Sequence, residues 1–342
     1  MKRIIPLCLA LIMTVGLLAG CGKQNEPAAS DETRLRVVTT IFPEYDWVRE
    51  ILDDKADNAE VTMLLDNGAD LHSYQPTADD IVKISECDLF IYVGGESDDW
   101  VDDALKNAAN ENMKVINLLE ALGERVKTEE AVEGMQEEEH DHDHDRENAD
   151  EHDDAKDHDH EEEAEYDEHV WLSLKNAQTL CSAISSVLQQ IDPDNKDTYA
   201  ANASAYIKKL SALDADYQAA VNAAACKTVL FGDRFPFRYL AEDYGLRYYA
   251  AFAGCSAESE ASFETISFLA GKVDELNLPC VLTIEGVQHK IAETIVRNTA
   301  AKNQKVLTMD SMQSTTSKDA ANGTTYLSVM ERNLSVLKEA LG

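Results

Sequence analysis

The chain has 342 residues and a hydrophobic fraction of 44%, so it is long enough for two globular units and too apolar to be disordered throughout. Its formal net charge is −35, concentrated between Glu129 and Glu168, where 22 Asp and Glu residues stand against two Lys and Arg residues. An acidic chain without a basic stripe repels phosphate backbones, which excludes nucleic-acid binding and favours cations as partners.

The first 21 residues are predicted to be a secretory signal peptide. Lys2 and Arg3 precede an apolar run over 4–18, which is too short to span a bilayer. The run ends in Leu18-Ala19-Gly20-Cys21, which resembles the bacterial lipobox, so a signal peptidase is expected to cut before Cys21 and the thiol to carry diacylglycerol. Residues 22–33 are polar and small, as suits a tether. These features predict an extracytoplasmic protein anchored to the cell membrane by lipid.

Two series of short apolar, β-branched runs predict parallel strands, because helix-compatible stretches separate the runs. The first series lies at 35–38, 61–65, 89–93 and 115–117, and the second at 228–231, 246–252, 281–284 and 306–309. The pattern predicts an α/β protein with two four-stranded parallel-sheet lobes, the first over 34–128 and the second over 227–342.

Two helices are predicted between the lobes. One covers 173–190, within a segment (169–193) that completes the N-terminal lobe. The next, within 194–226, carries apolar side chains at spacings of three and four residues: Tyr199, Ala203, Tyr206, Leu210, Leu213, Tyr217 and Ala220. This seam predicts one long connecting helix that packs in the core, and a continuous helix between two lobes resists wide hinge bending.

Six of the nine His residues lie in the acidic segment 129–168, which has too few apolar residues to fold and is predicted to be a disordered loop. They are His140, His142, His144, His152, His158 and His160. Imidazoles interleaved with carboxylates suit borderline divalent ions such as Zn²⁺. We expect this loop to collect metal weakly, because ordering it around an ion would cost backbone entropy.

Beyond Cys8 in the signal peptide and Cys21, five cysteines remain: Cys87, Cys181, Cys226, Cys255 and Cys280. Their number is odd and no CxxC pair occurs, so they form neither a zinc ribbon nor a disulfide framework. Most are predicted to be buried small apolar residues, and the sequence leaves one or two disulfides open.

Two further His residues lie in longer motifs. His72 belongs to Asp70-Leu-His-Ser-Tyr-Gln-Pro-Thr-Ala-Asp79, and His169 to Tyr166-Asp-Glu-His-Val-Trp-Leu-Ser173. With Tyr199-Ala-Ala-Asn202 and the long helix, these motifs resemble those of the metal-specific solute-binding proteins of bacterial ABC importers, in their zinc-uptake branch. The resemblance covers essentially the whole chain after the signal peptide, and the His-rich insert between the motifs makes it specific.

The resemblance implies two α/β lobes joined by a rigid helix, with one metal ion in the cleft, held by three His and a carboxylate. His72 matches the first family His, His169 the second and Asp310 the carboxylate. Arg234 occupies the position of the third His, and a guanidinium cannot ligate a cation. The resemblance further implies a monomeric receptor, not an enzyme, that captures Zn(II) and delivers it to an ABC permease and its ATPase.

The missing donor must come from another residue or from water. Ligands of open α/β sheets bind beyond the carboxyl ends of strands, where Asp233, Glu285 and Asp310 follow predicted strands. We favour Asp310 and Glu285 as the ligands beside the two His residues, and we expect Arg234 to pair with one of these strand-end carboxylates. Further candidates are His289, Glu258 and Glu260.

Three alternatives remain open. The loss of a His shifts preference toward oxygen donors and Mn²⁺, whereas the His-rich loop favours Zn²⁺, so manganese is the second choice of cargo. An exported zinc-dependent hydrolase is disfavoured, because no His-Glu-x-x-His helix, phosphate-binding glycine loop or Gly-x-Ser-x-Gly motif occurs. The third alternative is a metal-sequestering surface adhesin that serves no permease.

Overall fold

The computed structural model describes residues 34–136 and 165–342, without residues 107, 257–259 and 287–288. The predicted signal peptide with Cys21, and the six His residues of the acidic loop, lie outside the described residues. Within the described part, no helix is long and apolar enough to cross a membrane. Residues 35–342 form one compact unit.

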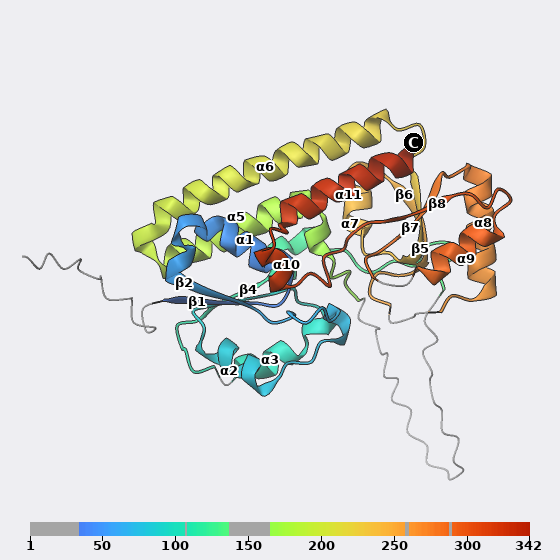
Figure 1. Ribbon diagram of the computed structural model, residues 1–342. Coiled ribbons are helices and arrows are strands. Elements are labelled where there is room, and N and C mark those ends of the chain that lie inside the picture. The colour runs from blue at the N-terminus through green and yellow to red at the C-terminus, as the bar shows by residue number, and fades with distance from the viewer. Residues whose placement is uncertain (1–33, 107, 137–164, 257–259, 287–288) are drawn as a thin grey trace, which may run out of the picture. The chain divides into compact units, whose positions relative to one another are not determined.

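The N-terminal lobe is built on a four-stranded parallel sheet of order β2-β1-β3-β4. Its strands are β1 (Leu35–Thr39), β2 (Ala59–Met63), β3 (Leu89–Tyr92) and β4 (Lys114–Asn117), and its helices are α1 (Phe42–Leu52), α2 (Ala78–Glu86), α3 (Trp100–Leu105), α4 (Leu118–Leu122) and α5 (Leu174–Ile191). Helices α2 and α3 cover one face of the sheet, and α1 and α5 the other (Figure 1). Because both faces are covered, β3 is apolar at consecutive positions instead of alternating.

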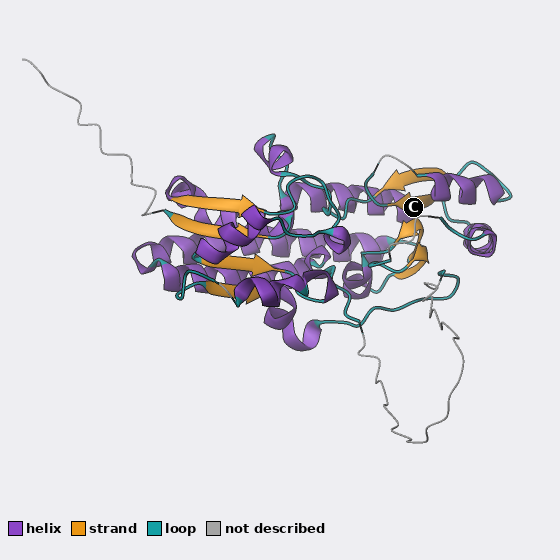
Figure 2. Ribbon diagram, turned by 90° about the horizontal axis from the view of Figure 1, so that it is seen from below, coloured by secondary structure: helices purple, strands orange, loops and turns teal. Residues whose placement is uncertain are grey.

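The C-terminal lobe repeats this plan with a parallel sheet of order β6-β5-β7-β8. Its strands are β5 (Thr228–Arg234), β6 (Arg247–Phe252), β7 (Cys280–Thr283) and β8 (Lys305–Thr308), and its helices are α7 (Arg238–Tyr244), α8 (Phe263–Leu276), α9 (Lys290–Asn298), α10 (Ser317–Ala321) and α11 (Tyr326–Leu341). Figure 2 shows the strands in two separate groups. The prediction of two four-stranded parallel lobes is confirmed.

The predicted connecting helix is α6 (Lys196–Ala223), which packs against α1 and α5 of the first lobe and α7 and α11 of the second (Figure 1). Its buried side chains are those of the predicted seam, with Val221 in place of Ala220. Tyr217 Oη donates to Met330 O of α11 at 2.7 Å. One cluster of buried apolar side chains extends from β1 through α6 to α11, so the lobes share a core that opposes hinge bending.

The two ends of the predicted acidic loop are ordered. Thr128 and Tyr166 form an antiparallel bridge that closes the base of the loop. From there, residues 129–136, called the strap below, extend to the second lobe, where Gln136 N donates to a carbonyl oxygen of β6 at 2.9 Å. Residues 129–136 and 165–168 of the predicted loop therefore belong to the described fold, and residues 137–164 lie outside the described residues.

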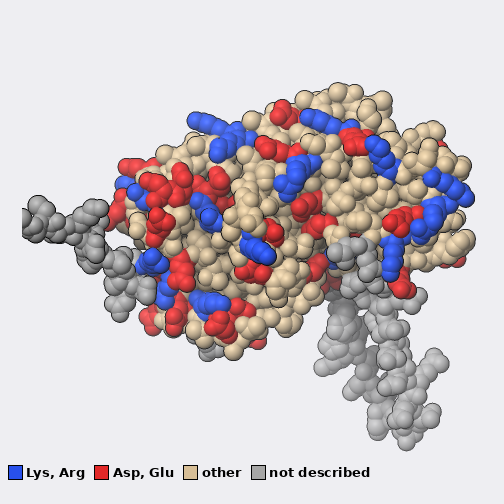
Figure 3. All heavy atoms as spheres, viewed as in Figure 1, with Lys and Arg blue, Asp and Glu red and all other residues tan. Residues whose placement is uncertain are grey.

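The described surface carries charges of both signs. On the face shown in Figure 3, acidic and basic side chains are interspersed, and no broad basic stripe is present on that face. Exposed ion pairs such as Lys83–Asp79 at 2.7 Å contribute little to stability.

Asp46 of α1 is a buried carboxylate whose protonation should control stability. Its Oδ2 accepts a hydrogen bond from Tyr326 N at 2.9 Å, and burial raises its pKa from 3.8 to about 7. A carboxyl whose folded-state pKa is raised contributes stability that is fully present below about pH 4 and is lost as the pH rises to about 7. We expect Asp46→Asn, which keeps an acceptor without the charge, to raise the unfolding free energy of the metal-free protein by about 2–4 kcal/mol at pH 8 and to leave it unchanged at pH 4. Urea unfolding at both pH values checks this, and an equal effect at both would contradict it.

Candidate metal centre

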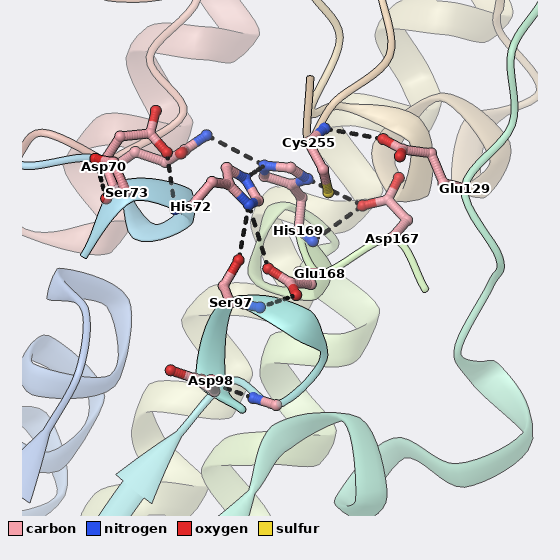
Figure 4. A network of polar contacts seen from close by, with 12 residues as sticks. Asp70, His72, Ser73, Ser97, Asp98, Glu129, Asp167, Glu168, His169 and Cys255 are labelled. Atoms are coloured by element: carbon pink, nitrogen blue, oxygen red, sulfur yellow. Dashed lines mark hydrogen bonds and ion pairs between the residues drawn. The ribbon is translucent and has the colours of Figure 1, made fainter. Parts of the chain in front are cut away.

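The structure brings the two motif His residues together. His72 lies in a 3-10 turn, Leu71–Ser73, after β2, and Asp70 Oδ1 caps this turn by accepting from His72 N at 3.1 Å. His169 directly precedes a second 3-10 turn, Val170–Leu172, that leads into α5. The two Nε2 atoms lie 3.2 Å apart, and His169 is fully buried (Figure 4).

Each imidazole is held at its Nδ1 atom by a carboxylate from the segment before α5. Asp167 Oδ1 lies 3.0 Å from His169 Nδ1, whereas Glu168 Oε2 and Ser97 Oγ lie 3.4 and 2.9 Å from His72 Nδ1. Ser97 N also donates to Glu168 Oε1 at 2.9 Å. Burial alone would raise the pKa of Glu168, but the hydrogen bonds from His72 and Ser97 hold it below its ordinary value. Carboxylates placed in this way orient metal-binding imidazoles and fix the proton on Nδ1.

With the protons on Nδ1, the lone pairs of both Nε2 atoms point into one small volume. Two such lone pairs 3.2 Å apart repel each other unless a proton or a cation lies between them. Zinc binds imidazole nitrogen at about 2.0–2.1 Å, so an ion bound to both atoms would make an N–Zn–N angle of about 103°, close to tetrahedral. The spacing of the His pair therefore suits a zinc ion.

The residue at the third-His position points to Asp70. Arg234 Nη2 donates to Asp70 Oδ2 at 2.5 Å, and Nη1 donates to Ser256 O at 3.3 Å. The expectation that Arg234 pairs with a strand-end carboxylate of the second lobe is wrong, because its guanidinium reaches Asp70 of the first lobe. Burial alone would raise the pKa of Asp70, but the charge and hydrogen bond of Arg234 hold it below its ordinary value. This ion pair joins the lobes beside the His pair.

Gln313 connects the same carboxylate to the His pair, and sequence reasoning missed it. Its side-chain amide lies 3.2 Å from His169 Nε2. In the amide orientation that satisfies both neighbours, the nitrogen donates to Asp70 Oδ1 and Oδ2 at 2.9 and 3.1 Å, and the oxygen accepts from His169 Nε2 at 3.2 Å when that nitrogen carries a proton. Gln313 thereby brings an oxygen atom of the second lobe to the His pair.

The two predicted carboxylate ligands hold a loop together in the structure. Glu285 accepts hydrogen bonds from Ser311 N at 2.6 Å, Ser311 Oγ at 2.7 Å and Gln313 N at 3.1 Å. Asp310 Oδ1 accepts from Met312 N at 2.8 Å. Burial and the charge of Asp310 raise the pKa of Glu285. Within the described part of the chain, neither carboxylate belongs to the group of potential metal ligands around the His pair.

A cavity of about 880 Å³ opens beside His72. Its charged lining residues are Asp70, Asp233, Arg234, Glu260, Glu285 and Lys290. Of the two predicted carboxylate ligands, only Glu285 lines this cavity. Among the further candidates, Glu258 lies outside the described residues, and His289 lies at the start of α9, apart from the His pair.

Cys255 is a further side chain that could ligate a metal, and sequence reasoning did not select it. The five cysteines are free thiols; Cys87, Cys181 and Cys280 are buried as predicted, whereas Cys226 and Cys255 are half-buried. One donor atom each of His72, His169 and Cys255 lies within 4.8 Å of the other two. Burial and the charge of Glu129 raise the pKa of the Cys255 thiol. The available signal was position, because Cys255 lies just beyond the carboxyl end of β6, where the strand-end rule places ligands.

Arg234→Ala should leave zinc binding measurable, because a guanidinium is not a ligand. We expect the affinity to fall by no more than about 10–100-fold, the range for removing a residue that only supports the ligands. Competition titration with a zinc chelator measures this. A loss as large as that of a ligating His would show that the Arg234–Asp70 ion pair is required to form the site.

Comparison with known proteins identifies the family. The family profile described as zinc-uptake complex component A, periplasmic (ZnuA), matches residues 37–340. The chain is 30% identical over 327 residues to the high-affinity zinc uptake system protein ZnuA of Bacillus subtilis, covering 95% of this chain and 94% of that protein. It is 32% identical over 339 residues to the zinc-binding lipoprotein AdcA of Streptococcus pneumoniae, covering 99% of this chain but only 61% of that longer protein.

A solved structure gives the same answer. The crystal structure of the Zn(II)-bound ZnuA-like domain of Streptococcus pneumoniae AdcA has a TM-score of 0.66 and 28% identity, covering 90% of this chain and 99% of that one. The sheets, the long helix and the motif His residues thus agree with the profile match over nearly the whole chain after the predicted signal peptide. The chain therefore belongs to the ZnuA family of periplasmic zinc-uptake components.

Proposed function

We propose that the protein is an extracytoplasmic receptor that captures Zn²⁺ and delivers it to an ABC-type permease and its ATPase. The observation that carries the proposal is the pair of Nε2 atoms 3.2 Å apart, each on an imidazole whose Nδ1 faces a carboxylate. Family membership supports the same cargo, because the relatives are named as zinc-uptake and zinc-binding proteins.

Zinc is favoured over manganese by the donor atoms. Two imidazole nitrogens and a nearby thiol are borderline and soft donors, which suit Zn²⁺, whereas Mn²⁺ prefers shells of carboxylate, carbonyl and water oxygens. The six His residues of the acidic loop point in the same direction. We propose that the loop collects Zn²⁺ weakly near the receptor.

We propose that His72 and His169 supply two donors and that a carboxylate of the second lobe adds another. Glu285 is the better placed of the two predicted carboxylates, since it lines the cavity beside His72. To reach the ion it would exchange its hydrogen bonds with Ser311 and Gln313 for the metal. Asp310 is the second candidate for this role.

The receptor is proposed to act as a lipid-anchored monomer and not as an enzyme. Its anchor would be the diacylglyceryl thioether of Cys21 at the predicted lipobox. A catalytic zinc needs a position open to water and substrate. Here His169 is fully buried and the second lobe covers it through Gln313, which favours a carrier over a hydrolase.

The test is a zinc titration of the protein after its metal has been stripped with a chelator. We expect about one tight Zn²⁺ site per chain, with further weaker sites, and we expect Mn²⁺ to compete poorly for the tight site. A protein that binds no divalent metal after reloading would refute the receptor function. Uptake of radioactive zinc is also measured in cells that lack the gene and in the same cells with the gene returned. A transport receptor restores uptake, whereas a surface protein that only sequesters metal does not.

A further inference from the structure

We propose that Cys255 is a ligand of the bound metal and that its thiolate replaces the His that is missing at the position of Arg234. This inference rests on the proposed function, because it assigns a donor to the same cargo. Cys255 comes from the second lobe, and one donor atom each of Cys255, His72 and His169 lies within 4.8 Å of the others. Figure 4 shows its Sγ atom beside the imidazole of His169.

The loop that carries Cys255 is fixed against the His pair from several sides. A Cβ atom at Gly254 would lie only 3.1 Å from Cε1 and Nδ1 of His169, so the glycine allows the backbone to rest on the imidazole. Cys255 N donates to Glu129 Oε1 of the strap at 2.8 Å. Arg234 Nη1 donates to Ser256 O at 3.3 Å. The arginine at the third-His position thus holds the cysteine loop instead of supplying a ligand.

The geometry is close to that of a zinc shell. With Zn–N near 2.05 Å and Zn–S near 2.3 Å, nitrogen and sulfur atoms of a tetrahedral site lie about 3.6 Å apart. One donor atom of each residue lies within 4.8 Å of the other two, so Sγ has to move toward the two Nε2 atoms to complete the site. A side-chain rotation or a small movement of the lobes supplies such a shift.

The charges around the thiol also favour a cation. Glu129, Asp167 and Glu168 all act on Cys255 with negative charge. When Zn²⁺ binds, the Zn–S bond forms as the S–H bond breaks, and the proton passes to solvent. Two neutral imidazoles and one thiolate leave a net charge of +1 on the ion, which these carboxylates offset. Glu285 of the second lobe is the proposed fourth ligand.

Cobalt substitution and X-ray absorption test the assignment on the purified protein. We expect the Co²⁺-loaded protein to show a sulfur-to-metal charge-transfer band, and the Zn²⁺-loaded protein to show one sulfur neighbour at about 2.3 Å. Cys255→Ser should remove both signals and weaken Zn²⁺ binding by about tenfold or more, while leaving the metal-free protein folded. Cys226→Ser is the matched control, since Cys226 is also free and half-buried but is not grouped with the His pair, and it should change neither signal.

The outcomes separate this inference from the receptor function. If the unaltered protein binds Zn²⁺ tightly with only nitrogen and oxygen neighbours, and Cys255→Ser binds as tightly, the thiolate ligand is refuted and the receptor stands. If the unaltered protein binds no metal, both are refuted. A sulfur signal that persists in Cys255→Ser and disappears in Cys226→Ser would show that Cys226 supplies the sulfur ligand, and it would also overturn the proposal.

Discussion

Replacing His72 or His169 by alanine is expected to weaken tight Zn²⁺ binding by at least about 100-fold, beyond the effect of losing a residue that only orients a ligand. The two Nε2 atoms face each other at 3.2 Å, so each variant removes one of two donors that are already in position. Water would fill the gap, and a shell that retains only one imidazole loses part of the nitrogen donation that favours zinc over manganese. Chelator competition at fixed pH measures the loss.

Because His169 is fully buried, its variant needs a check on folding. The melting temperature and circular dichroism of the metal-free protein supply this check. His289→Ala is the matched control: His289 directly precedes α9 and is not grouped with the His pair, so its loss should leave the affinity unchanged. Asp167→Asn should weaken Zn²⁺ binding by about 10–100-fold, more than His289→Ala and less than the two ligand variants, because it removes the carboxylate that orients His169. Tight binding that persists in both His variants would refute this site.

The fold could be predicted because its signals are local. Consecutive apolar residues in strands such as β3 reflect a sheet covered on both faces, and the regular seam of α6 reflects a helix buried along one side. The ordered strap was missed for the opposite reason. Residues 129–136 have no periodic apolar pattern, and they are held by one backbone hydrogen bond to β6 and by side-chain hydrogen bonds to Cys255 N and Ser262 N, which leave no pattern in the sequence.

The site could be predicted only where a motif carries it. The two His residues were found through their motifs and are brought together by the fold. The partner of Arg234 was not found, because Asp70 is 164 residues away and the ion pair depends on how the lobes meet. Cys255 was not predicted as a ligand, because five cysteines without a CxxC pair are typical of buried small apolar residues. Its position beyond β6, taken with the missing third His, was the signal that could have raised it as a candidate.

Replacing residues 137–164 by a Gly/Ser linker of about eight residues should remove the weak zinc sites and preserve the tight one. All six His residues of the acidic loop lie in this stretch, whereas the strap and His169 lie outside it. Glu129 N donates to Glu165 O at 2.8 Å, so the linker has to span no more than the seven residues from Glu129 to Gln136, roughly 24 Å when extended. Closing a shorter loop changes the entropy of the unfolded chain only slowly, so the stability should hardly change.

A longer deletion, over 129–164, gives a sharper contrast. This deletion removes Glu129, the acceptor of Cys255 N, as well as the acidic loop. We therefore expect it to weaken Zn²⁺ binding at the tight site, whereas the deletion of 137–164 should not.

A variant with all six loop His residues changed to Asn, and every carboxylate retained, separates imidazole binding from simple attraction by charge. If it loses the weak sites as completely as the 137–164 deletion, imidazoles bind the weakly held ions; if it keeps them, carboxylates do. Loss of the tight site in the 137–164 deletion would mean that loop His residues enter the shell of the captured ion, and the two-His centre would then be incomplete as described.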